Sequence, residues 1–151
     1  MEIVVNEWLL DYLRPDAEEC HQDLAIKFVN TWVKKCDKVV IRRPSPFVSK
    51  FHSYMKQFGR NQQFKKRLSK LYKLLFLDSN KTIIADDNDV KELPEEVIAK
   101  THSKDKYLIE LLYSKQERIF VTTDIKLRDK LQDETNLKIY ILQNFLQNYS
   151  T

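Results

Sequence analysis

Two patterns of apolar residues alternate along the chain. Short runs of four or five residues rich in Val and Ile are typical of buried strands, whereas apolar residues at every third or fourth position are typical of amphipathic helices. The runs predict strands at 2–5, 38–42, 82–85, 118–122 and 138–142. Because helical segments separate these strands, the chain should fold through βαβ units. We therefore predict an α/β fold, a three-layer α/β/α domain around a mostly parallel sheet of about five strands.

Capping residues indicate where several of the helices should begin. Asn6 is expected to cap a short helix that ends before Pro15. Asp16 and Glu19 have the spacing of a capping box, which predicts a longer helix that extends to about Cys36. Further helices are expected at 46–58, 61–76, 94–100, 103–113 and 124–133, and a last one is expected to be capped by Asn144.

The chain of 151 residues has the length of one domain, which we expect to span 1–151. No apolar run approaches the roughly 20 residues that cross a bilayer. The first residues lack the basic segment and the cleavage site of a signal peptide. These features predict a cytoplasmic protein.

Glycine and cysteine usage excludes several kinds of site. Gly59 is the only glycine, so the glycine-rich phosphate loop, the dinucleotide-binding turn and the nucleophile elbow are absent in their usual forms. Cys20 and Cys36 lack the C-x-x-C spacing of zinc and redox sites. We expect both to be buried apolar thiols on one helix rather than metal ligands.

Positive charge is concentrated in the middle of the chain. Residues 34–73 carry 13 basic groups and 1 acidic group, a net charge of +12, whereas both flanking segments are net acidic. A polyanion such as RNA or DNA is the expected partner, and a solvated face or an acidic protein partner is the alternative. The aromatic residues of 47–58 recur at helical spacing, so we expect them to pack in the core. The predicted RNA-binding residues are Arg42, Arg43, Lys50, Lys65, Lys66 and Arg67.

Polar residues follow several of the predicted strands. In open parallel sheets, ligands bind outside the carboxyl ends of the strands. Asn6 follows the first strand and Asp124 follows the fourth, while Asp86 and Asp87 follow the third. Asp105, in the first turn of a helix, is expected to come close to the same edge. Because carboxylates gathered at one edge repel one another unless a cation neutralises them, we predict bound Mg²⁺ or Mn²⁺.

The second half of the chain resembles a PIN domain. Asp105 opens a helix, and a strand that ends in Thr-Thr-Asp follows, with Asp124 lying 19 residues after Asp105. This pattern, within residues 94–127, is similar to the second half of the family's motif, and the order of elements agrees over most of the chain. The segment 3–6 also resembles the family's first strand, which ordinarily ends in aspartate.

The resemblance implies metal-dependent cleavage of RNA by one or two Mg²⁺ or Mn²⁺ ions that acidic side chains hold. Carried onto this chain, Asp105 and Asp124 are the metal ligands, and Asp129 would act through a water molecule. Asn6 takes the catalytic position of the first aspartate, and Lys50 or a neighbour takes the position of a helical glutamate. Two acids of the family are therefore absent, unless Glu7, Asp86 or Asp87 substitutes for them. Without a metal, Asp124 would be a helix N-cap and Asp105 a first-turn acid.

Two functions follow from these observations. The first is a PIN-like metal-dependent endoribonuclease that acts on single-stranded RNA, of the toxin type or the RNA-processing type. The second is a catalytically degenerate PIN-like domain that binds RNA or a protein partner through residues 34–73. The partners that the resemblance implies are RNA, a cognate antitoxin or another protein, and a second copy of the chain in a homodimer.

Overall fold

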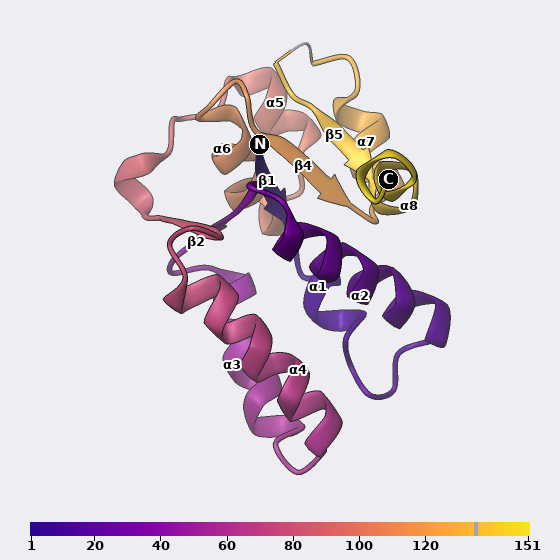
Figure 1. Ribbon diagram of the computed structural model, residues 1–151. Helices are drawn as coiled ribbons and strands as arrows, with labels where there is room; N and C mark the ends of the chain where they lie inside the picture. The colour runs from indigo at the N-terminus through magenta and orange to yellow at the C-terminus, as the bar shows by residue number, and fades with distance from the viewer. Residues whose placement is uncertain (135) are drawn as a thin grey trace.

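The computed structural model describes residues 1–134 and 136–151 and is built on one sheet (Figure 1). The strands pair in the order β3-β2-β1-β4-β5, and every neighbouring pair is parallel. The predicted α/β fold with a parallel sheet of five strands is confirmed. The strands are β1 (Glu2–Val5), β2 (Lys38–Arg42), β3 (Thr82–Ala85), β4 (Ile119–Thr122) and β5 (Ile139–Ile141).

The central strand β1 is buried on both faces of the sheet. Val4 lies beside Val40 of β2 and Phe120 of β4, and these three residues belong to one core. Ile3 and Val5 belong to the core on the other face. Successive side chains of a strand point to opposite faces, so an uninterrupted apolar run fills both cores at once.

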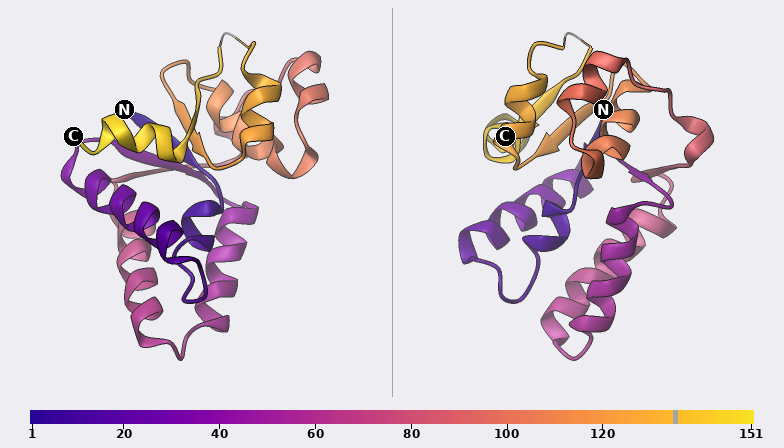
Figure 2. Two further views of the ribbon diagram at one scale, coloured as in Figure 1. Left: turned by 90° about the vertical axis from the view of Figure 1, so that its right-hand side faces the viewer. Right: turned by 180° about the vertical axis from the view of Figure 1, so that it is seen from behind.

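Helices cover both faces of the sheet and produce the three layers (Figure 2). One face packs against α1 (Trp8–Asp11), α2 (Glu19–Lys34), α3 (Pro46–Gln57), α4 (Gln62–Tyr72), the π-helix η1 (Lys73–Leu77) and α8 (Leu142–Tyr149). The other face packs against α5 (Glu95–Lys100), α6 (Lys106–Tyr113) and α7 (Ile125–Leu131). The 3₁₀ helices η2 (Asp87–Asp89) and η3 (Ser103–Asp105) precede α5 and α6. None of the helices in the described ranges has both the length and the apolar character that a bilayer crossing needs.

Helices α3 and α4 form a hairpin that extends away from the sheet, which we call the α3–α4 arm, residues 46–72 (Figures 1 and 2). Near its turn the rings of Phe58 and Phe64 meet edge to face, with centroids 5.2 Å apart. A Cβ atom at Gly59 would lie 2.9 Å from the carbonyl oxygen of Met55, so the tight turn needs a glycine. The Asn61 side chain caps α4 by accepting a hydrogen bond from the amide of Phe64.

The predicted capping box at the start of α2 is wrong. Asp16 instead forms an ion pair with Arg14 at 2.8 Å. Helix α2 begins at Glu19, and the side chain of its N-cap residue Glu18 makes no capping hydrogen bond. The guanidinium of Arg14, only two residues away, offers Asp16 a stronger, charge-assisted partner than a backbone amide does.

Two other predicted caps are also wrong. Asn144 lies inside α8, whose N-cap is Ile141, because the buried side chains of Leu142 and Leu146 extend the helix to an earlier start. Asn6 does not cap α1 through its side chain, since the N-cap position belongs to Glu7.

The prediction that both cysteines are buried on one helix is wrong. Cys20 and Cys36 are both exposed. Cys36 lies beyond Lys34, the last residue of α2, so the buried face of that helix does not continue to it. Cys20 lies in the first turn of α2, where its thiol approaches Glu18 at 3.6 Å.

Candidate functional site at the carboxyl edge of the sheet

The order of the strands reverses between β1 and β4. From β1 the chain proceeds to β2 and β3 on one side, and then returns to place β4 and β5 on the other. Ligands of open parallel sheets bind at the carboxyl ends of the strands at such a switch point. A cavity of about 200 Å³ lies there. It is lined by Asn6, Glu7, Trp8, Asp11, Tyr12, Lys104, Asp105, Thr123 and Asp124.

Asn6 directly follows β1 and brings an unsatisfied acceptor to the cavity. Its side-chain Oδ1 is buried and has no hydrogen-bond partner among the described residues. The indole of Trp8 donates a 2.8 Å hydrogen bond to the carbonyl of Val121 and so anchors this segment to β4. A buried acceptor without a partner costs about 1–3 kcal/mol, which a bound cation or donor would relieve.

Asp105 lies at the end of η3, immediately before α6, and its carboxylate has no hydrogen bond or ion pair within the described part of the chain. Burial raises the pKa of this carboxyl group. The charge of Lys104 opposes the shift, and the charge of Asp124 adds to it. Asp105 and Asp124 therefore repel each other, which a cation between them would offset.

Asp124 directly follows β4 and is the N-cap of α7. Its Oδ1 accepts a 3.0 Å hydrogen bond from the amide of Leu127, and its own amide donates to the hydroxyl of Thr122 at 3.1 Å. Among the described residues, Oδ2 has no hydrogen-bond partner. Asp124 thus caps the helix through Oδ1 and leaves Oδ2 available to a ligand.

Glu7 adds a further carboxylate on the β1 side of the cavity. The hydroxyl of Tyr107 is buried with no hydrogen-bond partner in the described ranges. Burial, together with the charges of Glu7 and Asp105, strongly raises the pKa of Tyr107, which keeps this hydroxyl protonated. Glu7 and Asn6 thus line the same cavity, to which Glu7 adds a negative charge.

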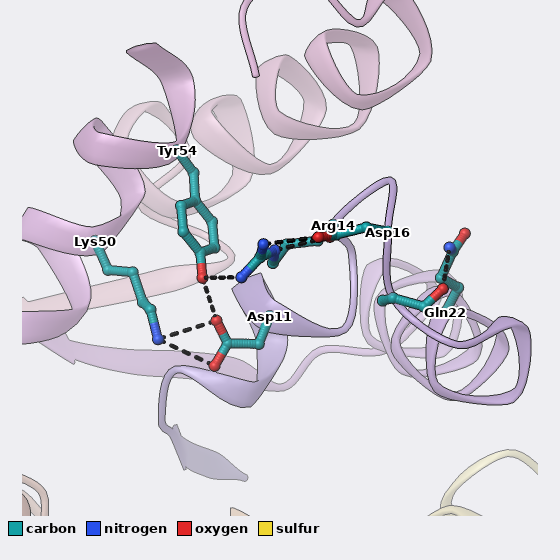
Figure 3. A network of polar contacts seen from close by, with 7 residues as sticks. Asp11, Arg14, Asp16, Gln22, Lys50 and Tyr54 are labelled. Carbon is teal, nitrogen blue, oxygen red and sulfur yellow. Dashed lines mark hydrogen bonds and ion pairs between the residues drawn. The ribbon is translucent and has the colours of Figure 1, made fainter. Parts of the chain in front are cut away.

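Lys50 contacts Asp11, one of the acids that line the cavity (Figure 3). Its ammonium lies 2.9 Å from Oδ1 of Asp11, and the hydroxyl of Tyr54 donates a hydrogen bond to the same carboxylate. Arg14 in turn donates to the Tyr54 oxygen at 3.5 Å. The charge of Lys50 is thus paired with Asp11, and Lys50 is not among the residues that line the cavity.

Three other acids that the sequence analysis considered as ligands do not line the cavity. Asp86 caps η2 by accepting from the amide of Asn88 at 2.8 Å. Asp87 pairs with Arg42 at the end of β2, and β3 is two strands away from β1. Asp129 pairs with its neighbour Arg128 and does not line the cavity. The carboxyl edge therefore brings Asn6, Asp105 and Asp124 together and leaves these acids apart.

The predicted RNA-binding residues divide into paired and unpaired groups. The guanidinium of Arg42, with 12% of its side chain exposed, contacts both Asp87 and Glu110. Arg67 donates a 3.0 Å hydrogen bond to Gln22 of α2. Lys50 is paired with Asp11, and the guanidinium of Arg43 lies over the Phe76 ring. Lys65 and Lys66 are exposed on α4.

The residues of the cavity fit a hard divalent cation. The amide oxygen of Asn6 and the carboxylates of Glu7, Asp105 and Asp124 are all oxygen ligands, which Mg²⁺ and Mn²⁺ prefer. The unpartnered Oδ1 of Asn6 and the unpaired carboxylate of Asp105 are the observations that favour this fit. The carboxylates of the cavity do not already lie close together in the way that ligands of a bound ion do. Within the described ranges, only Glu18, Cys20 and His21 bring three His, Cys, Asp or Glu ligand atoms within 4.8 Å of one another.

Two residues beside this site were missed in the sequence. Asp11 lies four residues after Glu7, a spacing that places two side chains on the same face of a helix, so the pair could have been found from this signal. Tyr107 gives no such signal, because its place in the repeating pattern of α6 is that of an ordinary core aromatic.

A scan against protein-family models, a search of curated proteins and a search of solved structures each found no match to this chain. The resemblance to PIN domains therefore rests on the residues of this chain.

Proposed function

We propose that the chain is a PIN-like, metal-dependent endoribonuclease that cleaves single-stranded RNA, of the toxin type or the RNA-processing type. The observation that carries this proposal is the buried, unpartnered Oδ1 of Asn6 beside the carboxylates of Asp105 and Asp124 in the cavity at the switch point. Unsatisfied oxygen atoms gathered at a ligand-binding edge favour a reaction that a cation assists.

The residues of the cavity have complementary roles in this proposal. Asn6, Asp105 and Asp124 would hold Mg²⁺ or Mn²⁺, and the ion, when bound, would activate a water molecule and stabilise the leaving oxygen. Glu7 restores part of the negative charge that the amide of Asn6 lacks. Lys104 lines the same cavity and offers its ammonium to a phosphate oxygen of the substrate.

The amide at Asn6 favours a second candidate function, a catalytically degenerate PIN-like domain that binds RNA or a protein partner without cutting. Asn6 supplies a neutral ligand, and Lys50 or a neighbour, not an acid, takes the glutamate position of the PIN pattern. A site with fewer carboxylates binds a divalent cation less tightly. A cognate antitoxin and a homodimer remain predictions.

Mn²⁺ binding by calorimetry and RNA cleavage, measured on the same samples, test the proposal. A labelled unstructured RNA of about 12 nucleotides is a suitable substrate. The parent protein should bind Mn²⁺ weakly and cleave the RNA slowly, and Asp105→Ala and Asp124→Asn should each lose both properties. Asp129→Asn is the matched control, because it removes an exposed acid that lies outside the cavity, and it should retain both.

Asn6→Asp restores the carboxylate of the PIN pattern. It should raise Mn²⁺ affinity about tenfold and increase the cleavage rate. Cleavage that persists in Asp105→Ala would show that the site is wrong. Mn²⁺ binding without cleavage, in both the parent and Asn6→Asp, would instead favour the degenerate domain.

A further inference from the structure

The outer face of α4, together with the turn before it and the first residue of η1, carries a row of basic side chains beside a hollow in the surface. Arg60, Lys65, Lys66, Lys70 and Lys73 line this hollow of about 630 Å³, and its other lining residues are neutral. We call these five cations the α4 basic face. The hollow lies on the α3–α4 arm and is separate from the cavity at the carboxyl edge, with which it shares no lining residue.

The burial pattern of α4 fixes which side of the helix faces the solvent. Phe64, Leu68 and Leu71 are buried in the core, so the opposite side of the helix is exposed. Lys66 and Lys70 are four residues apart on that side and are therefore neighbours. Like charges at this spacing repel and weaken a helix, so the row opposes the stability of the element that carries it.

The five cations have no partners within the described part of the chain. Their side chains form no ion pair and no hydrogen bond there, whereas Arg42 and Lys50, from the same basic segment, are both paired with acids. No acidic residue occurs between Asp37 and Asp78 that could neutralise them locally. The α4 basic face is therefore a positive surface without internal compensation.

The length of this face selects the kind of anion that can neutralise it. Residues 62–73 extend over about 17 Å at the helical rise of 1.5 Å per residue. A single phosphate cannot reach cations spread over that length, whereas a nucleic-acid backbone presents a series of charges. The arm starts at the carboxyl edge, where Lys50 of α3 contacts Asp11, which lines the cavity.

We propose that the α4 basic face binds the phosphate backbone of single-stranded RNA and holds the substrate at a distance from the cavity where cleavage occurs. The choice of RNA rests on the proposed function, and the choice of a polyanion rests on the uncompensated charge. The exposed lysines contact the backbone rather than base edges, so binding is independent of base sequence.

Fluorescence anisotropy in EDTA tests binding without any contribution from metal or cleavage. The probe is a labelled oligouridine of about 12 nucleotides, titrated with the full chain over a series of salt concentrations. The triple variant Lys66→Gln, Lys70→Gln, Lys73→Gln should weaken binding at least tenfold. It should also reduce the slope of log affinity against log salt by about 2, since each lost contact to a single strand contributes about 0.7.

The matched control removes the same charge from another surface. Lys91, Lys130 and Lys138 are exposed and unpaired within the described residues, and their triple change to Gln should alter affinity less than threefold. The pair Arg60→Gln, Lys65→Gln probes the other part of the same face and should also weaken binding, which protects the test if one variant fails to fold.

Three outcomes would overturn the proposal that the α4 basic face binds RNA. The first is an unchanged affinity in both α4 variants, and the second is an equal loss of affinity in the control variant. The third is tighter binding to a polyglutamate peptide or to phosphatidylserine vesicles than to the RNA. An oligothymidine DNA presents the same series of phosphates and should bind with similar affinity, so the choice of RNA over DNA rests on the cleavage test of the proposed function. This test is independent of the nuclease activity, because RNA binding through the α4 basic face in EDTA would persist even if no variant cleaved RNA.

Discussion

At the scale of single residues, the contact between Lys50 and Asp11 changes the charge of the candidate site. In sequence, Lys50 is a cation near the position of an expected glutamate, which opposes a metal ion. In the fold its ammonium is held by Asp11, and the hydroxyl of Tyr54 donates to the same carboxylate. The pair contributes little net charge to the cavity, so the electrostatics of the cavity depend on the other charged residues that line it, which are Glu7, Lys104, Asp105 and Asp124.

The Lys50–Asp11 pair should stabilise the fold in a pH-dependent way. Burial lowers the pKa of Lys50, but the hydrogen bond and the charge of Asp11 outweigh burial and raise the pKa above its ordinary value of 10.5. A raised pKa means that the stabilisation is fully present below pH 10.5 and is lost as the pH rises through the folded-state pKa. With 31% and 39% of the two side chains exposed, the pair is worth about 1 kcal/mol or less.

Lys50→Met retains most of the alkyl stem and removes the charge. It should lower the free energy of unfolding by urea at about pH 8, and the difference from the parent should shrink as the pH rises above 10.5. A difference that stays constant across this range would show that packing of the stem, rather than the ion pair, is the stabilising contribution.

At the scale of secondary-structure elements, the start of α7 combines two uses of Asp124. Its Oδ1 caps the helix through the amide of Leu127, while its charge acts on Asp105. Loss of a capping side chain costs about 1 kcal/mol, and Asn caps as well as Asp does. Asn and Ala at this position therefore separate the two roles of Asp124.

Asp124→Asn and Asp124→Ala should differ in stability but agree in metal response. In EDTA, Asp124→Asn should melt at the parent temperature or above, since it keeps the cap and removes repulsion with Asp105. Asp124→Ala should melt about 2–4 °C lower, which corresponds to a loss of about 1 kcal/mol. Both should lose the rise in Tm that Mn²⁺ causes in the parent. Equal destabilisation by both variants, with no effect of Mn²⁺ on the parent, would identify a helix cap without a metal role.

At the scale of the whole molecule, Arg118 connects segments that are far apart in sequence. It is 3% exposed, donates to Glu2 of β1 at 3.0 Å, and also donates to the carbonyl of Leu111 and the hydroxyl of Ser114. These contacts join the first strand, the end of α6 and the start of β4. They support the pairing of β1 with β4, on which the switch-point cavity depends.

Arg118→Ala should lower the free energy of unfolding by about 3 kcal/mol, because it removes a buried guanidinium and leaves the partly buried carboxylate of Glu2 with only Lys115, at 3.8 Å, as an ion-pair partner. Glu2→Gln should cost only about 1 kcal/mol, since the amide oxygen still accepts a hydrogen bond. Arg128→Ala is the control, because its pair with Asp129 is exposed, and it should change stability by less than about 0.5 kcal/mol. Urea titrations measure all three. A loss below 1 kcal/mol for Arg118→Ala would contradict a structural role for this contact.

The candidate site was predictable only in part from the sequence. Asp105, Asp124 and Asn6 were found because they directly follow or precede elements with clear patterns. Asp86 and Asp87 have equally good positions after a strand, yet they lie apart from the cavity because β3 is at the edge of the sheet. The sequence does not state which strand ends are neighbours, since the strand order depends on contacts between distant segments.

The sequence by itself determined the elements, the parallel α/β class and the cap of α7 at Asp124. The spacing of apolar residues and the chemistry of helix ends are local properties, which act over one or two turns whatever the rest of the chain does. Only the tertiary structure decided that β1 lies beside β4, that Lys50 is neutralised by Asp11, and that Asp16 pairs with Arg14 instead of capping α2. Those outcomes depend on burial and on competition between partners, which arise only when the chain has folded.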